Sequence, residues 1–152
     1  MRFQSILTIL VCLFATSFVL AQANSEFPDG LRGFSMSSSF QFDGKEYRYE
    51  LNTDAIKDTP SWNVSDGEPP LPIVRAVDIA KAQLKKLIKK TKGWDVDFVN
   101  LHQADRKKWY YEIHFTCIEI GCSDKATGGF TILVKLDGSP VEPKVTKVPN
   151  RS

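Results

Sequence analysis

The sequence predicts an α+β domain in which one amphipathic helix packs on an antiparallel β-meander sheet of four to five strands. Its clearest strand is 109–117 (WYYEIHFTC), where Tyr111, Ile113, Phe115 and Cys117 fall on one side, because side chains alternate along an extended chain. A helical pattern precedes this segment and an apolar strand pattern follows it. We therefore expect 109–117 to be the central strand and the helix to cover one face of the sheet.

The helix is predicted to begin at Pro72, since the missing N–H of proline costs nothing in a first turn, and to stop by Gly93. Lysines gather toward its C-terminal end, where they complement the negative end of the helix dipole. Apolar residues recur at three- and four-residue spacing. They form one predicted stripe: Ile73, Val77, Ala80, Leu84, Leu87 and Ile88.

Two strands are predicted before the central one. Residues 40–51 alternate in polarity around Asp43-Gly44, which predicts a strand or a hairpin that turns at this pair. Residues 94–101 alternate at first and then lose their phase, which indicates a β-bulge or the end of a strand.

Two more strands are predicted after the central one. Residues 130–136 alternate again and extend the meander. Residues 141–148 carry a proline and several lysines, a composition typical of an edge strand that is protected against sheet-to-sheet association. Between the first strand and the helix lies a long connection, 52–70, and we expect its Trp62 to pack against the body of the domain.

The first 23 residues have the features of a secretory signal peptide. A basic Arg2 precedes an apolar run, and Ala21-Gln22-Ala23 is a small-x-small pattern, so cleavage is expected after Ala23. The apolar run is shorter than the about 20 residues that span a bilayer, so no stable membrane anchor is expected after cleavage. The expected organisation is therefore a signal peptide (1–23), a flexible leader (24–39), a single domain (40–148) and a tail (149–152).

Export would place the mature chain in an oxidising compartment, secreted or periplasmic, with two cysteines, Cys117 and Cys122. A disulfide between them is the expected state, and two unpaired thiols are the alternative. The formal net charge of +2 falls closer to zero when Arg2 leaves with the signal, so no nucleic acid partner is expected. We expect a monomer.

No catalytic, cofactor-binding or metal-binding constellation is predicted. His102 and His114 are the two histidines, and neither has a nucleophile in a known local motif. Asp95 and Asp97 share one face of a predicted strand, but two carboxylates without further oxygen ligands are a weak calcium or acid–base signal. Asn63-Val64-Ser65 matches the N-glycosylation acceptor pattern.

From Pro70 to Val145 the order of these elements resembles the PepSY-type module of secreted bacterial proteins. The resemblance lies in the helix VRAVDIAKAQLKKLI, the strand WYYEIHF and the closing segment FTILVKLDGSPVEPKV. It implies a module that binds or restrains peptidases or other envelope partners and has no catalytic residues. The outline is also similar to cystatins, but the inhibitory Gln-x-Val-x-Gly hairpin is absent, and the nearest segment, QFDGK (41–45), has its glycine misplaced and no valine.

Two functional hypotheses follow. The first is a non-catalytic exported module that binds a protein or peptide partner, such as a peptidase, through the outer face of the sheet or the loop around Cys122. The alternative is a small-molecule or lipid carrier with an apolar pocket between helix and sheet. That pocket would be lined by residues such as Trp94, Phe98, Tyr111 and Phe115.

Overall fold

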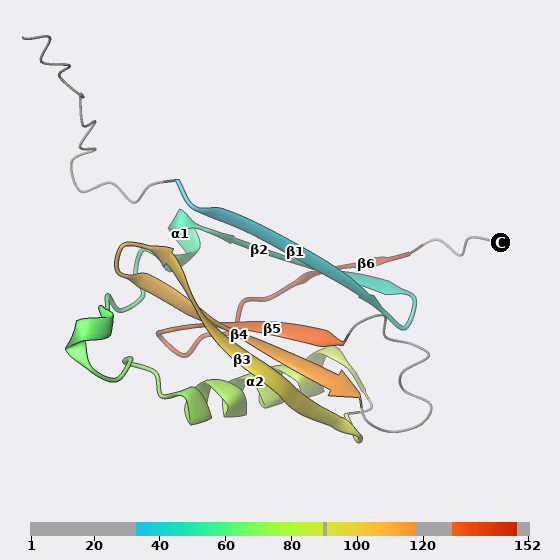
Figure 1. Ribbon diagram of the computed structural model, residues 1–152. Coiled ribbons are helices and arrows are strands. Elements are labelled where there is room, and N and C mark those ends of the chain that lie inside the picture. The colour runs from blue at the N-terminus through green and yellow to red at the C-terminus, as the bar shows by residue number, and fades with distance from the viewer. Residues whose placement is uncertain (1–32, 90, 118–128, 149–152) are drawn as a thin grey trace, which may run out of the picture.

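The computed structural model describes residues 33–89, 91–117 and 129–148 (Figure 1). The helices are α1 (Thr53–Ile56) and α2 (Ile73–Leu87), with the 3₁₀ helix η1 (Val64–Asp66) between them. The strands are β1 (Ser35–Phe42), β2 (Lys45–Asn52), β3 (Trp94–Asp105), β4 (Lys108–Cys117), β5 (Phe130–Lys135) and β6 (Lys144–Lys147).

The fold is α+β with one main helix, but its strands form two sheets. Sheet A has the order β1-β2-β6 and sheet B the order β3-β4-β5, and both are antiparallel. The prediction of a single sheet of four to five strands is therefore wrong. The predicted central position of 109–117 is confirmed, because β4 lies between β3 and β5.

The segment that follows β5 explains why there are two sheets. After β5 the chain turns back, so that Pro140 bridges Val134 and the Val141 N–H donates to the Leu133 carbonyl at 2.8 Å. It then leaves sheet B, and β6 pairs with β2 instead. Strand patterns in a sequence indicate which segments are extended, but they do not indicate which strand each one joins.

The β1–β2 hairpin turns at Asp43-Gly44, as predicted. Both residues have positive φ, 50° and 71°, which is the conformation of a two-residue hairpin turn. The first strand begins at Ser35 rather than at Phe40, so residues 35–39 belong to sheet A and not to a leader. A run of serines has low strand propensity, and the pairing with β2 overrides it.

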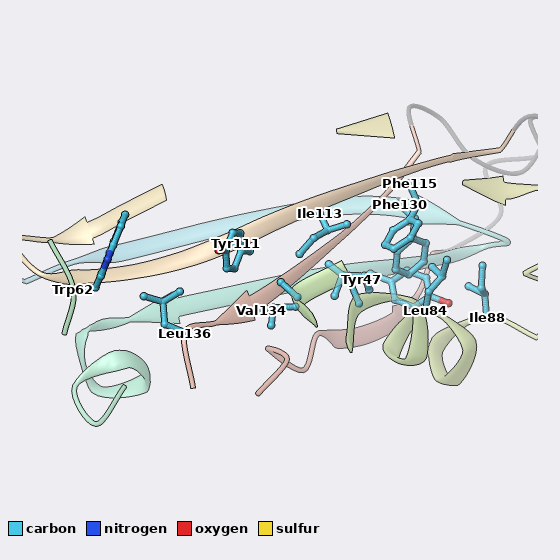
Figure 2. Close-up of a cluster of buried hydrophobic side chains, with 13 residues drawn as sticks. Tyr47, Trp62, Leu84, Ile88, Tyr111, Ile113, Phe115, Phe130, Val134 and Leu136 are labelled. Carbon is cyan, nitrogen blue, oxygen red and sulfur yellow. The ribbon is translucent and has the colours of Figure 1, made fainter. Parts of the chain in front are cut away.

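The main hydrophobic core lies between α2 and one face of sheet B. Ile113 and Phe115 of β4 are 0% and 1% exposed, and Phe130, Ile132 and Val134 of β5 are fully buried, so the predicted burial of the central strand is confirmed. Figure 2 shows Phe115 and Phe130 close to Leu84 near the end of α2 and to Tyr47 from sheet A, with Ile113 and Val134 further along the same layer.

The predicted stripe of α2 is confirmed in part. Ala80, Leu84 and Ile88 are buried and Leu87 packs against the core, whereas Ile73 is 50% exposed. Ala76 and Gln83 are also buried, although they were not predicted to be. Two alanines in this stripe let the helix backbone approach the sheet closely. The predicted start is confirmed, since Pro72 is the N-cap residue, but the helix ends at Leu87 with Ile88 as the C-cap residue, five residues before Gly93.

Sheet A packs against sheet B through aromatic side chains. Phe40 and Tyr47 contact Phe130 in edge-on geometry, with ring centroids 4.3 and 5.0 Å apart. A second buried cluster joins Tyr49 and Leu51 of sheet A to residues on the other face of sheet B, and its members are Tyr49, Leu51, Ile56, Tyr110, Leu133 and Val141.

The long connection before α2 is tied to sheet B by Trp62, as predicted. Trp62 is 8% exposed, and its ring lies edge-on to that of Trp109 at 5.2 Å. Its backbone carbonyl accepts a hydrogen bond of 3.0 Å from the Trp109 indole, and its backbone N–H donates to the Lys107 carbonyl.

Within the described ranges, no helix is long and apolar enough to cross a membrane.

Substitutions on the two sides of α2 test this packing. Leu84→Ala removes a buried side chain and leaves a cavity, so we expect it to lower the free energy of unfolding by about 2 to 5 kcal/mol. Ile73→Ala, on the same helix but exposed, should change it by less than about 0.5 kcal/mol. Urea unfolding followed by circular dichroism measures both values. Equal losses for the two variants would contradict the observed helix orientation.

The four tyrosines of the chain predict a loss of stability at high pH. Burial raises the pKa of Tyr47, Tyr49, Tyr110 and Tyr111, with the largest shift at Tyr49, where Glu142 adds to it. Because the folded pKa values lie above the unfolded value of about 10, their contribution to stability is complete below pH 10. It is lost as the pH rises through the folded values.

We therefore expect the unfolding free energy to fall above pH 10, and to fall less in Tyr49→Phe, which lacks the most strongly shifted phenol. Denaturant unfolding at a series of pH values measures both slopes. The same slope in the two proteins would show that Tyr49 ionises as easily in the folded chain as in the unfolded one.

Candidate functional site

The face of sheet B that points away from α2 carries a group of half-exposed polar and aromatic side chains. We call it the outer face and define it by Phe98, His102, Glu112, His114 and Thr131. Register brings these residues together, because Phe98 lies opposite His114 and His114 opposite Thr131. They come from all three strands of sheet B, which fix their spacing.

His102 and Glu112 form an ion pair or hydrogen bond across β3 and β4. Their Nε2 and Oε2 atoms are 2.7 Å apart, and the side chains are 41% and 30% exposed. The His102 ring also stacks on Tyr110, with centroids 5.3 Å apart. Burial raises the pKa of Tyr110, and the nearby Glu112 carboxylate adds to the shift, so this phenol stays neutral under the imidazole.

Phe98 and His114 form the second pair of the outer face. Their rings are nearly parallel, at 7°, with centroids 4.7 Å apart. The His114 Nδ1 atom lies 3.1 Å from the Thr131 hydroxyl oxygen, which fixes the orientation of the imidazole. Phe98 is 43% exposed, so a large apolar ring is presented to solvent in a fixed position.

A β-bulge puts Phe98 on this face. The register of β3 against β4 shifts between Val96 and Phe98, so Asp97 is the extra residue. Val96 faces Phe115 on the core side, whereas Phe98 faces His114 on the outer side. The predicted loss of phase is confirmed, but it occurs before Phe98 and not after it.

The predicted candidates for chemistry are distributed as follows. Asp95 lies on the outer side of β3 opposite Thr116, and its carboxylate accepts a hydrogen bond from the Val96 N–H. Asp97 sits in the bulge. The described residues contain no group of three or more potential metal-ligating side chains.

His102 and His114 do share one face, but they do not form a relay. The acid that lies between them in sequence, Glu112, is bonded to His102, while His114 is bonded to Thr131. A hydroxyl nucleophile needs a base that is itself oriented by an acid. The hydroxyl of Thr131 and the carboxylate of Glu112 thus belong to two separate pairs.

The four residues expected to line an apolar pocket are not on one surface. Tyr111 and Phe115 are fully buried in the core, and Trp94 is packed against the same core. Phe98 is on the opposite face of sheet B. The side chains that a carrier would need around its ligand are therefore split between the core and the solvent.

Two further predictions involve residues near or beyond the ends of the described ranges. Cys117 is the half-buried last residue of β4, but Cys122 and Ala23 lie outside the described residues, so the disulfide and the cleavage site stay predictions. Asn63 lies at the start of η1, and its side-chain amide donates to Asp66 at 3.2 Å. Its glycosylation is likewise still a prediction.

Two features of the outer face are predictable from the sequence, and its exact register is not. The histidines were visible as candidates, and the bulge was visible as a loss of phase. The contact of His114 with Thr131 depends on the pairing of β4 with β5 across a long connection. The predicted meander contains that pairing, but it does not contain the register that places His114 opposite Thr131.

Searches with this chain found no matching family model, no matching curated protein and no matching solved structure.

Gly129 lies close to the His114 side chain, at one end of the outer face. Its φ is +91°, and a Cβ atom placed there would lie 2.6 Å from the Phe115 carbonyl oxygen and 2.7 Å from His114 Cε1. We therefore expect Gly129→Ala to destabilise the fold by about 1 to 3 kcal/mol through backbone strain alone, with the overlap adding to this.

Gly44→Ala is the matched control, because Gly44 also has positive φ but has open space around it. We expect Gly44→Ala to lower the free energy of unfolding by less than Gly129→Ala does. The expected loss is about 1 to 2 kcal/mol, the cost of placing a side chain in the left-handed region. Denaturant unfolding compares them. A loss at Gly129 no larger than that at Gly44 would contradict the close packing of this glycine on His114.

Proposed function

We propose that this chain is an exported, non-catalytic module that binds a protein or peptide partner through the outer face of sheet B, in the cell envelope or outside the cell. The observation that carries the proposal is the exposed Phe98 ring held parallel to His114. An aromatic side chain that is already fixed loses little conformational entropy on binding, and aromatic residues are common anchors of protein interfaces.

The polar groups around Phe98 support the same proposal. His102, Glu112 and Thr131 offer donors and acceptors at fixed positions on three strands, as the polar surround of an interface requires. They are half-exposed and form no relay for catalysis. A surface of this kind suits a partner with both apolar and hydrogen-bonding groups, such as a peptide segment.

The cellular location and the class of partner rest on the sequence. Export follows from the signal-like residues 1–23. The resemblance of 70–145 to PepSY-type modules makes an envelope or secreted peptidase the first class of partner to test. A carrier function has less support, because three of the four residues expected around a ligand pack in the main core.

The proposal is tested by capture of a partner from the exported fraction of the host. The bait is the protein with a photo-crosslinking residue at Asn100, which is exposed on β3 two residues from Phe98. Phe98→Ala should reduce recovery of a specific partner about tenfold, since loss of an interface anchor costs more than about 1 kcal/mol.

Ile73→Ala is the matched control, because Ile73 is a similarly exposed apolar residue on α2. This variant should capture the partner as the unmodified bait does. Equal capture by the Phe98 and Ile73 variants, or no specific partner at all, would contradict binding through the outer face. Circular dichroism of each variant confirms that it is folded.

A further inference from the structure

The sheet edges of this protein are not equally protected. Strand β3, at one edge of sheet B, has two register irregularities and carries Asp95, Asp97 and Asp105, and the outer edge of β5 is occupied by Pro140 and the residue after it. Strand β6 has four residues, two of them lysines. Bulges, charges and short length are the usual means by which proteins prevent edge pairing.

Strand β1 has none of these protections. It is eight residues long, SMSSSFQF, with no charged residue and no proline, and it pairs with β2 without any register shift. Within the described part of the chain, β1 is the end strand of sheet A. Figure 1 shows it along one side of the molecule, with no described element beyond it.

The hairpin geometry fixes which backbone groups of β1 point outward. Phe42 and Lys45 flank the two-residue turn, and such a pair exchanges both of its hydrogen bonds. Since the pattern alternates, even-numbered residues of β1 bond to β2. The bond from the Thr53 N–H to the Phe34 carbonyl, 3.1 Å, continues this series. The outward groups belong to Ser35, Ser37, Ser39 and Gln41.

We propose that the free edge of β1 pairs with β1 of a second copy of this chain, antiparallel and centred on Ser38. In this register Ser37 of each copy faces Ser39 of the other, and Ser35 faces Gln41. Every outward N–H and C=O of the four residues then meets an outward group of the other copy. The two three-stranded A sheets become one continuous sheet across a twofold axis.

The side chains of β1 favour a second copy as the occupant of this edge. The register that matches the backbone groups also places Met36 opposite Phe40 and Phe34 opposite Phe42, and all four are half-buried apolar residues. Aromatic cross-strand pairs of this kind stabilise a sheet. No like charges meet, because 35–42 contains none. The sequence alone predicted a monomer, since it does not reveal which strand lies at an edge.

Sedimentation equilibrium over a range of concentrations tests the assembly. We expect a reversible dimer whose population rises with concentration. Ser37→Pro removes an outward N–H and leaves the bonds to β2 intact, and proline is tolerated on an edge strand. It should weaken dimerisation at least tenfold. Ser37→Ala, which loses the same hydroxyl but keeps the N–H, should dimerise like the unmodified protein.

A cysteine at Ser38 tests the register. In the proposed register, Ser38 of one copy lies opposite Ser38 of the other, in a pair without mutual hydrogen bonds. The Cα atoms of such a pair are about 4.5 Å apart, which is within the range of a disulfide. Ser38→Cys should therefore form a covalent dimer on mild oxidation, whereas Ser35→Cys, in the same background of native cysteines, should not.

A single species of monomer mass at every concentration would overturn the proposal. So would dimerisation that Ser37→Pro leaves unchanged, or crosslinking that is equal for the two cysteine variants, because the dimer would then use another surface. The outcome does not depend on binding through the outer face, since none of these substitutions touches sheet B.

Discussion

The structure depends on the burial of one face of β4 and β5 under α2. Ile113, Phe115, Ile132 and Val134 lose all or almost all contact with solvent, and the alternation that buries them leaves the other face of the same strands for Tyr110, Glu112 and His114. A sheet with one face committed to the core has a strongly specified register. Part of that other face packs against sheet A through Tyr110 and Leu133, and the outer-face residues beside them have the same fixed register.

Small residues make the approach of α2 possible. Ala76 and Ala80 are fully buried, so the first turns of the helix pack with their backbone near the sheet, and Leu84 and Ile88 fill the core at its C-terminal end. Gln83 is buried in the same stripe, and its side-chain amide donates to Glu142 at 2.7 Å. This bond connects the helix to the segment that links the two sheets.

Local patterns predicted the elements of this fold well and their assembly in part, since the meander of sheet B was predicted and the division into two sheets was not. The central strand, the helix boundary at Pro72, the Asp43-Gly44 turn and the bulge in β3 each depend on residues that are neighbours in the sequence. The division into two sheets depends on β2 pairing with β6, where Tyr47 lies opposite Val145. The helix stripe was predicted only in part, with Ile73 included and Ala76 left out, because helical spacing cannot distinguish a buried alanine from an exposed isoleucine when both faces carry apolar residues.

The pairing of β2 with β6 sets an order on how the chain can reach its final shape. The β1–β2 hairpin and the β3–β4 hairpin each consist of contacts between near neighbours, so they can form early. Sheet A is complete only when Lys144–Lys147 has arrived, from a part of the chain that follows the whole of sheet B. A chain that emerges gradually from a ribosome or a translocation pore must therefore hold β2 with one open side until β6 has followed, and only then can sheet A take its final form.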